Sequence, residues 1–175
     1  DRLWIGSQNG LCVINRGGQK YYPDGVFQEE EIYKIFRIPE GKIVVVSNSG
    51  FYFLKNNFNE NLIEQLQRNP IQGTNCVAIT GENEYMVGTN YGLLFIRGDQ
   101  KLLMNIHDGV LSDNINDILY VPGHHFAWVA TSEGLMRIDL HGLRKGNTTE
   151  LAIKEVLIHQ DDKNWQPSLT NTFNY

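Results

Sequence analysis

Two adjacent histidines are the most suggestive residues for chemistry in this sequence. His124 and His125 stand between a Val-Pro-Gly segment and Phe126, and an imidazole can bind a metal or transfer a proton near neutral pH. The Pro-Gly context is typical of a turn, however, and neighbouring residues of a strand point to opposite faces of a sheet, which is poor geometry for a shared metal. We therefore predict an exposed hairpin turn here and no metal site.

Carboxylates and thiols provide no clear site either. Glu29-Glu30-Glu31 and Asp161-Asp162 lack the spaced ligands of a calcium loop, so we interpret both as solvated loop residues. Cys12 and Cys76 each lie in an apolar run, without a second Cys or a His at metal-ligand spacing. Buried apolar thiols are the simpler interpretation, and a disulfide between the two is the alternative.

Patterns that mark enzymes are missing from the sequence. It holds no nucleotide-binding glycine loop, zinc-hydrolase helix, serine-hydrolase elbow or paired redox cysteines. Basic residues are too few and scattered for a nucleic-acid face, and the net charge of −5 points the same way. No apolar run reaches the ~18 residues of a membrane span. We therefore expect no catalysis, no cofactor, no metal and no nucleic-acid partner.

One pattern, by contrast, recurs four times along the 175 residues. Each copy is an apolar run, a Ser or Thr, two variable residues, a Gly and a second apolar run. The copies follow one another at steps of 40, 42 and 42 residues. The hydroxyl positions are Ser7, Ser47, Thr89 and Thr131, and the glycines are Gly10, Gly50, Gly92 and Gly134.

Each copy predicts two β-strands joined by a tight turn. The apolar runs are short and rich in β-branched and aromatic residues, and the glycine supplies the positive φ that a tight hairpin needs. The hydroxyl can fix the turn by bonding to local backbone. Because the runs are apolar almost without alternation, both faces of each sheet should be covered. Small residues follow large ones where a neighbouring sheet would come close, at Trp4/Gly6, Met86/Gly88 and Trp128/Ala130.

Small sheets stacked face to face at a period near 40 residues are typical of a β-propeller. The sequence therefore predicts an all-β fold, a partial β-propeller of about three to four four-stranded blades with a short C-terminal strand segment and little helix. Inner strands are expected at residues 32–39, 76–81 and 115–122, and outer strands at 20–22 and 101–106. Residues 60–68 fit a short helix or an irregular outer strand equally well. The first copy lacks an inner strand, so the open blade faces should be covered by the remaining blades of a parent chain or by a second copy.

The chain is expected to divide near residue 146. Residues 1–146 carry the repeats, and residues 147–175 form a linker with an outer strand or with the start of a following domain. Within this tail, residues 151–159 read as a strand with Ile153, Val156 and Ile158 at its apolar positions. The abrupt start at Asp1 and the stop at Tyr175 favour a piece of a longer protein.

Residues 108–139 resemble the two-component regulator propeller repeat. That repeat has an Asp-Gly-Leu box, an Ile-x-x-Ile strand and a Trp-Ile-Gly-Thr-x-x-Gly-Leu hairpin. Its parts are matched in turn by Asp108-Gly109-Val110, by Ile115-Asn116-Asp117-Ile118 and by residues 128–135.

The other copies match this repeat to different degrees. Residues 3–11 match the hairpin almost fully, and Asp24-Gly25-Val26 is a second box, 84 residues before the first. Val44 and Met86 replace the tryptophan, and the third copy has Asn69-Pro70-Ile71 in place of a box. The tail is similar to the opening of the triple-tyrosine immunoglobulin-like domain that follows such propellers.

The resemblance implies a function in signalling. In that family the propeller is the periplasmic sensing region of a hybrid two-component sensor kinase of the inner membrane, whose kinase module would lie outside this chain. The chain would then bind a small molecule or an oligosaccharide, without catalysis, in a receptor that forms a homodimer. The alternative is a structural or protein-interaction propeller that mediates receptor dimerisation, and a propeller lyase or hydrolase ranks below both.

Ligand-binding residues are expected where loops of several blades converge at a channel mouth. Residues near the starts of inner strands would lie there, and aromatic and amide groups suit sugars. The candidates are Tyr33, Asn75, Asn114 and Asp117. Trp4 and Trp128 share one repeat position, so we interpret them as packing residues rather than as sugar platforms.

Overall fold

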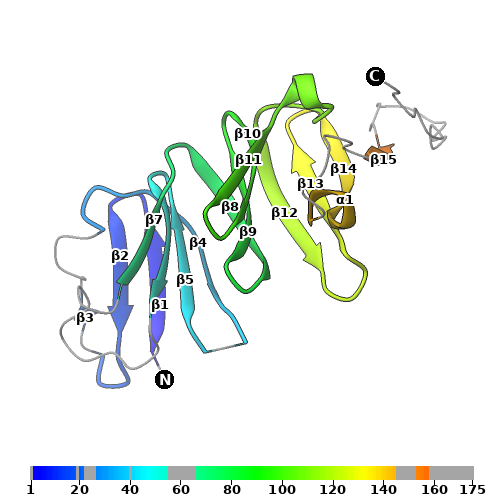
Figure 1. Cartoon of the computed structure of the whole chain (residues 1–175). Coiled ribbons are helices and arrows are strands. Elements are labelled where there is room, and N and C mark those ends of the chain that lie inside the picture. Colours follow the sequence, from blue (N-terminus) through cyan, green and yellow to red (C-terminus); the bar gives the residue numbers. More distant parts are fainter. Residues whose placement is uncertain are drawn as a thin grey trace, which may run out of the picture. The chain divides into compact units, whose positions relative to one another are not determined.

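A computed structural model describes residues 2–18, 20–21, 27–39, 41–54, 66–144 and 153–157 of the chain. These residues form antiparallel β-sheets with two short helices (Figure 1). The chain divides into two compact units, Asp1–Asn75 and Cys76–Tyr175. The all-β class predicted from the sequence is therefore confirmed for the described residues.

Unit 1 holds two sheets. Sheet 1 has three strands in the order β1 (Leu3–Ser7), β2 (Gly10–Ile14) and β3 (Lys20–Tyr21). Sheet 2 has four strands in the order β4 (Ile32–Arg37), β5 (Ile43–Ser47), β6 (Gly50–Leu54) and β7 (Leu66–Pro70). Among the described residues, sheet 1 has no strand that corresponds to β4, as the sequence predicts for the first copy.

Unit 2 repeats this arrangement with two four-stranded sheets. Sheet 3 consists of β8 (Thr74–Gly81), β9 (Glu84–Thr89), β10 (Gly92–Arg97) and β11 (Gln100–Met104). Sheet 4 consists of β12 (Ile115–Val121), β13 (Phe126–Thr131), β14 (Gly134–Asp139) and β15 (Ile153–Leu157). The short helices are η2 (Ile106–Asp108) and α1 (Leu140–Arg144).

The four predicted hairpin turns have the same geometry. In each, the Ser or Thr hydroxyl donates to the carbonyl of the glycine three residues on, at 3.0, 3.5, 2.8 and 3.0 Å. The same oxygen accepts the backbone N–H two residues on, at 3.2, 3.3, 3.0 and 3.1 Å. The glycine φ angles are 114°, 143°, 128° and 142° for Gly10, Gly50, Gly92 and Gly134.

Space as well as φ requires glycine at these turns. A Cβ at Gly10, Gly50 or Gly92 would lie 2.3 Å from a backbone carbonyl oxygen. These oxygens belong to Asn69 in the outer strand β7, to Met104 at the end of the outer strand β11, and to Phe27, which follows β3. These three glycines therefore let a third segment of their own repeats close onto the turn.

Within each unit the two sheets pack face to face. We call the side of a sheet that bears the residues three and one positions before its turn hydroxyl (Trp4 and Gly6 before Ser7, Met86 and Gly88 before Thr89) its front face, and the opposite side its back face. In unit 1 the front face of sheet 1 (Trp4, Gly6, Leu11, Val13) packs on the back face of sheet 2, and the buried cluster joins Leu11 and Phe27 to Ile43, Val45, Tyr52 and Leu54. A Cβ at Gly6 would lie 2.5 Å from Ile32 Cγ2, so the small residue after Trp4 admits the next sheet.

Unit 2 uses the same faces. The front face of sheet 3 (Met86, Gly88, Leu93, Phe95) packs on the back face of sheet 4 (Ala127, Val129, Met136, Ile138) in one buried cluster. A Cβ at Gly88 would lie 2.6 Å from Ile115 Cγ2. Ile32 and Ile115 are both the first residues of inner strands, so the same contact occurs in the two units. This confirms the packing role predicted for the small residues at 6 and 88.

The Asp-Gly box of unit 2 has a structural role. Asp108 accepts the backbone N–H of Asn105 at 3.0 Å in a capping box around η2, and Gly109 follows with φ 89°. Val110 is buried, and Asp113 accepts the N–H of Ile106 at 2.9 Å. The Asp-Gly box therefore fixes the turn that connects sheets 3 and 4, and Val110 after it packs in the core that the two sheets share. The corresponding box at residues 24–26 lies outside the described residues.

The remaining strand predictions have mixed outcomes. The inner strands and both outer strands occur within two residues of their predicted limits. Residues 66–68 belong to a strand rather than a helix, and 60–65 lie outside the described residues. β15 pairs with β14 as the fourth strand of sheet 4. Residues 147–152 and 158–175 are not described, so the boundary at 146 and the immunoglobulin-like segment stay predictions.

Candidate functional site

The four predicted ligand residues lie in different surroundings. Tyr33 lies on β4 with 49% of its side chain exposed, whereas Asn75 is half-buried on β8. Asn114 is exposed before β12, and its carbonyl accepts the N–H of Ser132 at 3.1 Å. Asp117 is exposed on β12, where its carboxylate accepts the N–H of Ile118 at 3.0 Å. Tyr33 joins a network of polar side chains, and ligand binding by all four residues stays a prediction.

Tyr33 stands at an irregularity of its strand. The pairing of β4 with β5 shifts register between Ile32 and Lys34, which leaves Tyr33 as the extra residue. The pairing of β12 with β13 shifts at the corresponding place and leaves Asn116 extra. A bulge re-aims the side chain it releases and is common beside functional sites. Both inner strands therefore present one re-aimed side chain close to the hairpin turn of their sheet.

A carboxylate with three hydroxyl neighbours lies beside Tyr33. Glu30 accepts hydrogen bonds from Ser49 Oγ at 2.6 Å and from Tyr52 OH at 2.8 Å, and it also accepts one from Ser47 Oγ. Ser47 and Tyr52 are buried, with 0% and 6% exposed. The interpretation of Glu29-Glu30-Glu31 as solvated loop residues is therefore wrong for Glu30, which is held by hydroxyls from β5, β6 and their turn.

A second, more exposed layer covers this group. Tyr33 OH donates to Glu31 Oε2 at 2.9 Å. Glu31 and Asn48 are tied twice, because the Glu31 N–H donates to Asn48 Oδ1 at 3.1 Å and the Asn48 N–H donates to the Glu31 carbonyl at 3.1 Å. We name the whole set the carboxylate–hydroxyl cluster. It comprises Glu30, Glu31, Tyr33, Ser47, Asn48, Ser49 and Tyr52.

The chemistry of the cluster suits a neutral, hydroxyl-rich ligand. Its exposed members, Glu31, Tyr33 and Asn48, offer a carboxylate acceptor, an aromatic ring and an amide. The buried members fix the loop and the turn that carry them, which limits the entropy lost on binding. No group of three potential metal ligands occurs among the described residues. The cluster thus presents hydrogen-bond donors and acceptors to a ligand.

Tyr52 makes the cluster sensitive to alkaline pH. Burial, the hydrogen bond to Glu30 and the negative charge of Glu30 raise the pKa of Tyr52 above the ordinary tyrosine value of about 10. The pKa of Tyr52 is therefore higher in the folded than in the unfolded state. The stability that Tyr52 contributes is complete at pH values below its pKa in the unfolded state, and it is lost as the pH rises through its pKa in the folded state.

We accordingly expect the free energy of unfolding to fall as pH rises above about 10, and the fall to be smaller in Tyr52→Phe. Urea unfolding followed between pH 8 and pH 11 measures this difference. An equal fall in the wild type and in Tyr52→Phe would contradict the assigned network.

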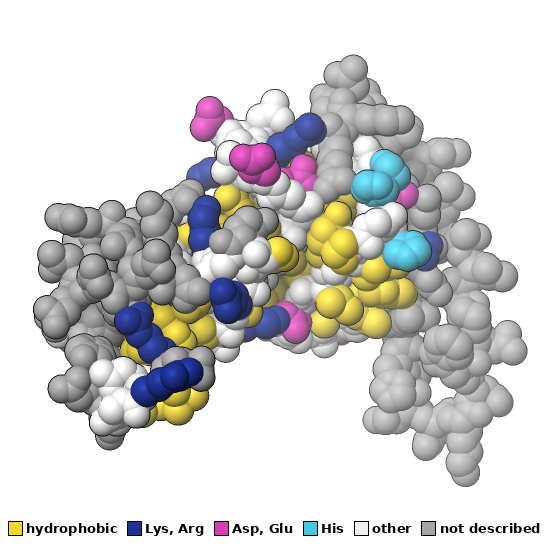
Figure 2. Space-filling view, turned by 90° about the horizontal axis from the view of Figure 1, so that it is seen from below, with side chains coloured by type: hydrophobic (Ala, Val, Ile, Leu, Met, Phe, Trp, Pro, Cys, Tyr) yellow, Lys and Arg dark blue, Asp and Glu magenta, His cyan; other side chains and the backbone are white. Residues whose placement is uncertain are grey.

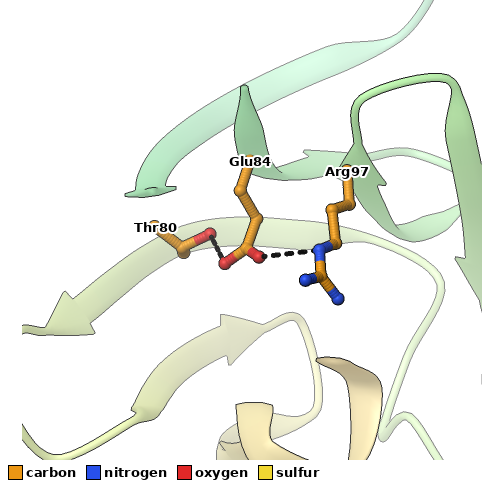
Figure 3. Close-up of polar contacts among 3 residues, drawn as sticks. All are labelled: Thr80, Glu84 and Arg97. Carbon is orange, nitrogen blue, oxygen red and sulfur yellow. Dashed lines mark hydrogen bonds and ion pairs between the residues drawn. The ribbon is translucent and has the colours of Figure 1, made fainter. Parts of the chain in front are cut away.

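Unit 2 contains a buried carboxylate of a different kind. Glu84 on β9 is only 6% exposed, accepts the Thr80 hydroxyl at 2.9 Å, and lies with Oε2 3.8 Å from Arg97 Nε (Figure 3). These residues come from three neighbouring strands, β8, β9 and β10. Burial alone raises the pKa of the adjacent Tyr85. We interpret this group as a clamp across sheet 3 rather than as a ligand site.

The two histidines singled out from the sequence occupy a turn, as predicted. His124 and His125 lie in the turn between β12 and β13. The His125 ring lies 4.5 Å from that of His141 on α1, and the His124 ring lies 5.7 Å from that of Phe126. In the view from below, histidine side chains lie next to hydrophobic ones (Figure 2). The His125–His141 contact could not be predicted from sequence, because 16 residues and two strands separate the pair.

The described units are therefore stacks of small antiparallel sheets, and a solved structure with a TM-score of 0.62 shares this fold. The extracellular domain of the hybrid two-component system BT3049 from B. thetaiotaomicron matches 78% of this chain with a TM-score of 0.62 at 19% identity. The extracellular domain of the one-component system BT4673 from the same organism matches 78% with a TM-score of 0.44 at 15% identity. PorZ, a surface component of the type-IX secretion system of Porphyromonas gingivalis, matches 79% with a TM-score of 0.33 at 12% identity.

The sequence resemblance to two-component sensors is thus confirmed at the level of the fold. The solved structure matched with a TM-score of 0.62 is an extracellular domain, and at 19% identity the likeness shows a shared fold. The chain spans 20%, 26% and 23% of the lengths of the three solved chains. No family model and no curated protein matches the sequence. None of the helices in the described part of the chain is long and apolar enough to cross a bilayer.

Proposed function

We propose that this chain is part of a β-propeller in the extracytoplasmic sensor region of a two-component system, and that it binds a carbohydrate without catalysing a reaction. The repeated packing of front face on back face, seen once in each unit, supports the propeller. The fold shared with an extracellular sensor domain supports the sensing role. The kinase and the membrane anchor would belong to other parts of the receptor.

The carboxylate–hydroxyl cluster carries the proposal for the ligand. It lies at the hairpin-turn end of sheet 2, and such loop ends are the usual binding sites of propellers. Its exposed groups can accept and donate hydrogen bonds to sugar hydroxyls, and the Tyr33 ring, 49% exposed, can stack on a sugar face. The exposed aromatic ring of Tyr33, beside the Glu31 carboxylate to which its hydroxyl donates, favours a ligand over a purely structural role.

Binding to the cluster is testable with a set of neutral oligosaccharides. We expect at least one of them to raise the melting temperature of the chain, because a ligand that binds only the folded state stabilises it. Tyr33→Ala should abolish that rise. Tyr91→Ala is the matched control, since Tyr91 is an aromatic residue 67% exposed at the turn between β9 and β10, outside the cluster. A rise that survives Tyr33→Ala, or no response to any oligosaccharide, would contradict the proposal.

A further inference from the structure

One backbone contact recurs at the end of sheets 3 and 4 that lies opposite their hairpin turns. In sheet 3 the carbonyl of Asn83, directly before β9, accepts the N–H of Gly98, directly after β10, at 2.9 Å. Forty-two residues on, the carbonyl of His125, directly before β13, accepts the N–H of Leu140, directly after β14, at 2.8 Å. Asn83 and His125 also share a left-handed backbone, with φ of 51° and 53°. The repeat therefore fixes the positions of both segments relative to each other.

The side chains at these positions differ between the two sheets. Sheet 3 has Asn83 and, directly after Gly98, Asp99, whereas sheet 4 has His125 and, directly after Leu140, His141. The imidazole rings of His125 and His141 lie 4.5 Å apart between centroids. His141 is exposed and His125 is half-buried, and histidine side chains reach the surface in the view from below (Figure 2). An ion from solution can therefore approach the pair.

The separation of the two rings fits two ligands of one metal ion. Imidazole nitrogens bind zinc at about 2 Å, which places the centroids of two rings on one ion about 5 Å apart. The observed 4.5 Å lies close to that value. The rings belong to different elements, His125 to the turn between β12 and β13 and His141 to α1, whose first residue, Leu140, is wholly buried. Because both backbones are held in place, little order has to be created when an ion binds.

The charges around the pair favour a cation. Asp139, the last residue of β14, accepts the backbone N–H of His141 at 2.9 Å, so a carboxylate lies beside the pair. The positive charge of Arg137 lies over the Phe126 ring, 5.4 Å from its centroid. Among the described residues, no third Cys, His, Asp or Glu completes a metal-binding group with the two histidines. Water would therefore take the remaining positions around the ion.

We propose that His125 and His141 bind a divalent transition-metal ion such as Zn²⁺, and that the ion links the turn between β12 and β13 to α1. Imidazole suits zinc, nickel and copper(II), whereas Mg²⁺ requires oxygen ligands. This site differs from the adjacent pair His124-His125 that was rejected from the sequence, because 16 residues separate its two members. With two protein ligands, it binds an ion more weakly than a structural site with four. The proposal does not depend on a carbohydrate ligand.

Calorimetric titration of the 175-residue chain with ZnCl₂, after a chelator has removed bound metal, tests the proposal. We expect saturable binding of one Zn²⁺ per chain and no binding of Mg²⁺. His125→Asn and His141→Gln should each weaken Zn²⁺ binding at least about tenfold, because each removes one of two protein ligands. Asparagine is chosen at 125 because Asn83 holds the same left-handed position in sheet 3. His107→Gln is the control and should leave binding unchanged, since His107 is exposed in η2, outside the pair.

Thermal unfolding separates loss of the ion from loss of the fold. Without metal, His125→Asn and His141→Gln should melt within about 2 °C of the wild type. ZnCl₂ should raise the melting temperature of the wild type, because an ion that binds the folded state stabilises it, and it should not raise that of either variant. If a variant does not fold, the imidazole proton resonances of wild-type His125 and His141 provide the test, since both should shift together as Zn²⁺ saturates the site. A wild type that binds no Zn²⁺, or binding that survives either substitution unchanged, would overturn the proposal.

Discussion

Replacing Gly92 by alanine is expected to destabilise the chain by about 3 kcal/mol or more, because the change combines backbone strain with a collision. Gly92 has φ 128°, which an L-residue rarely adopts, and its Cβ would lie 2.3 Å from the Met104 carbonyl oxygen. That oxygen is backbone and cannot rotate away. Chemical unfolding followed by tryptophan fluorescence measures the loss.

Gly98→Ala is the matched control for this prediction. Gly98 also has a positive φ, 57°, but a Cβ there would meet nothing within 4 Å. Its loss should be about 1 kcal/mol, the usual cost of a left-handed alanine. Equal losses in Gly92→Ala and Gly98→Ala would show that the turn glycine has no packing role, contrary to the geometry shared by the other turns.

Met136→Ala should destabilise the chain by about 2–5 kcal/mol, the range for removing a buried side chain of this size. Met136 is 0% exposed on the back face of sheet 4 and lies in the cluster shared with the front face of sheet 3. The same unfolding measurement applies. Leu102→Ala is the control, because Leu102 on β11 is 39% exposed and should lose far less. A loss at Met136 no larger than at Leu102 would mean that the two sheets of unit 2 do not share a core.

The sequence predicts the hairpins well because their determinants are local. A Ser or Thr hydroxyl and a glycine three residues later provide the hydrogen bonds and the positive φ angle of the turn. Because this pair recurs at steps of 40, 42 and 42 residues, it is unlikely to be a chance match. The same holds for Gly6 and Gly88, whose position two residues after a large side chain indicates a close neighbouring sheet. The neighbour itself, Ile32 or Ile115, becomes known only from the structure.

The candidate site was only partly predictable for the opposite reason. Tyr33 could be chosen from its place near the start of an inner strand, but the role of Glu30 depends on hydroxyls 17 to 22 residues away, on β5, on β6 and in the turn between them. No short spacing marks such a group. Adjacent acidic residues such as Glu29 and Glu30 cannot be told apart in the sequence. The structure shows that Glu29 is exposed, whereas Glu30 accepts hydrogen bonds from three hydroxyls.

Nuclear Overhauser effects between the sheets test the central claim most directly. The claim is that successive repeats stack front face on back face within each unit, with a glycine of one sheet against the first isoleucine of the next. It predicts strong effects from the Hα protons of Gly88 to the γ2 methyl of Ile115, and from those of Gly6 to the γ2 methyl of Ile32, since a Cβ at these glycines would lie 2.6 and 2.5 Å from those methyl carbons. Absence of both, in a spectrum that shows the cross-strand effects within each sheet, would contradict it.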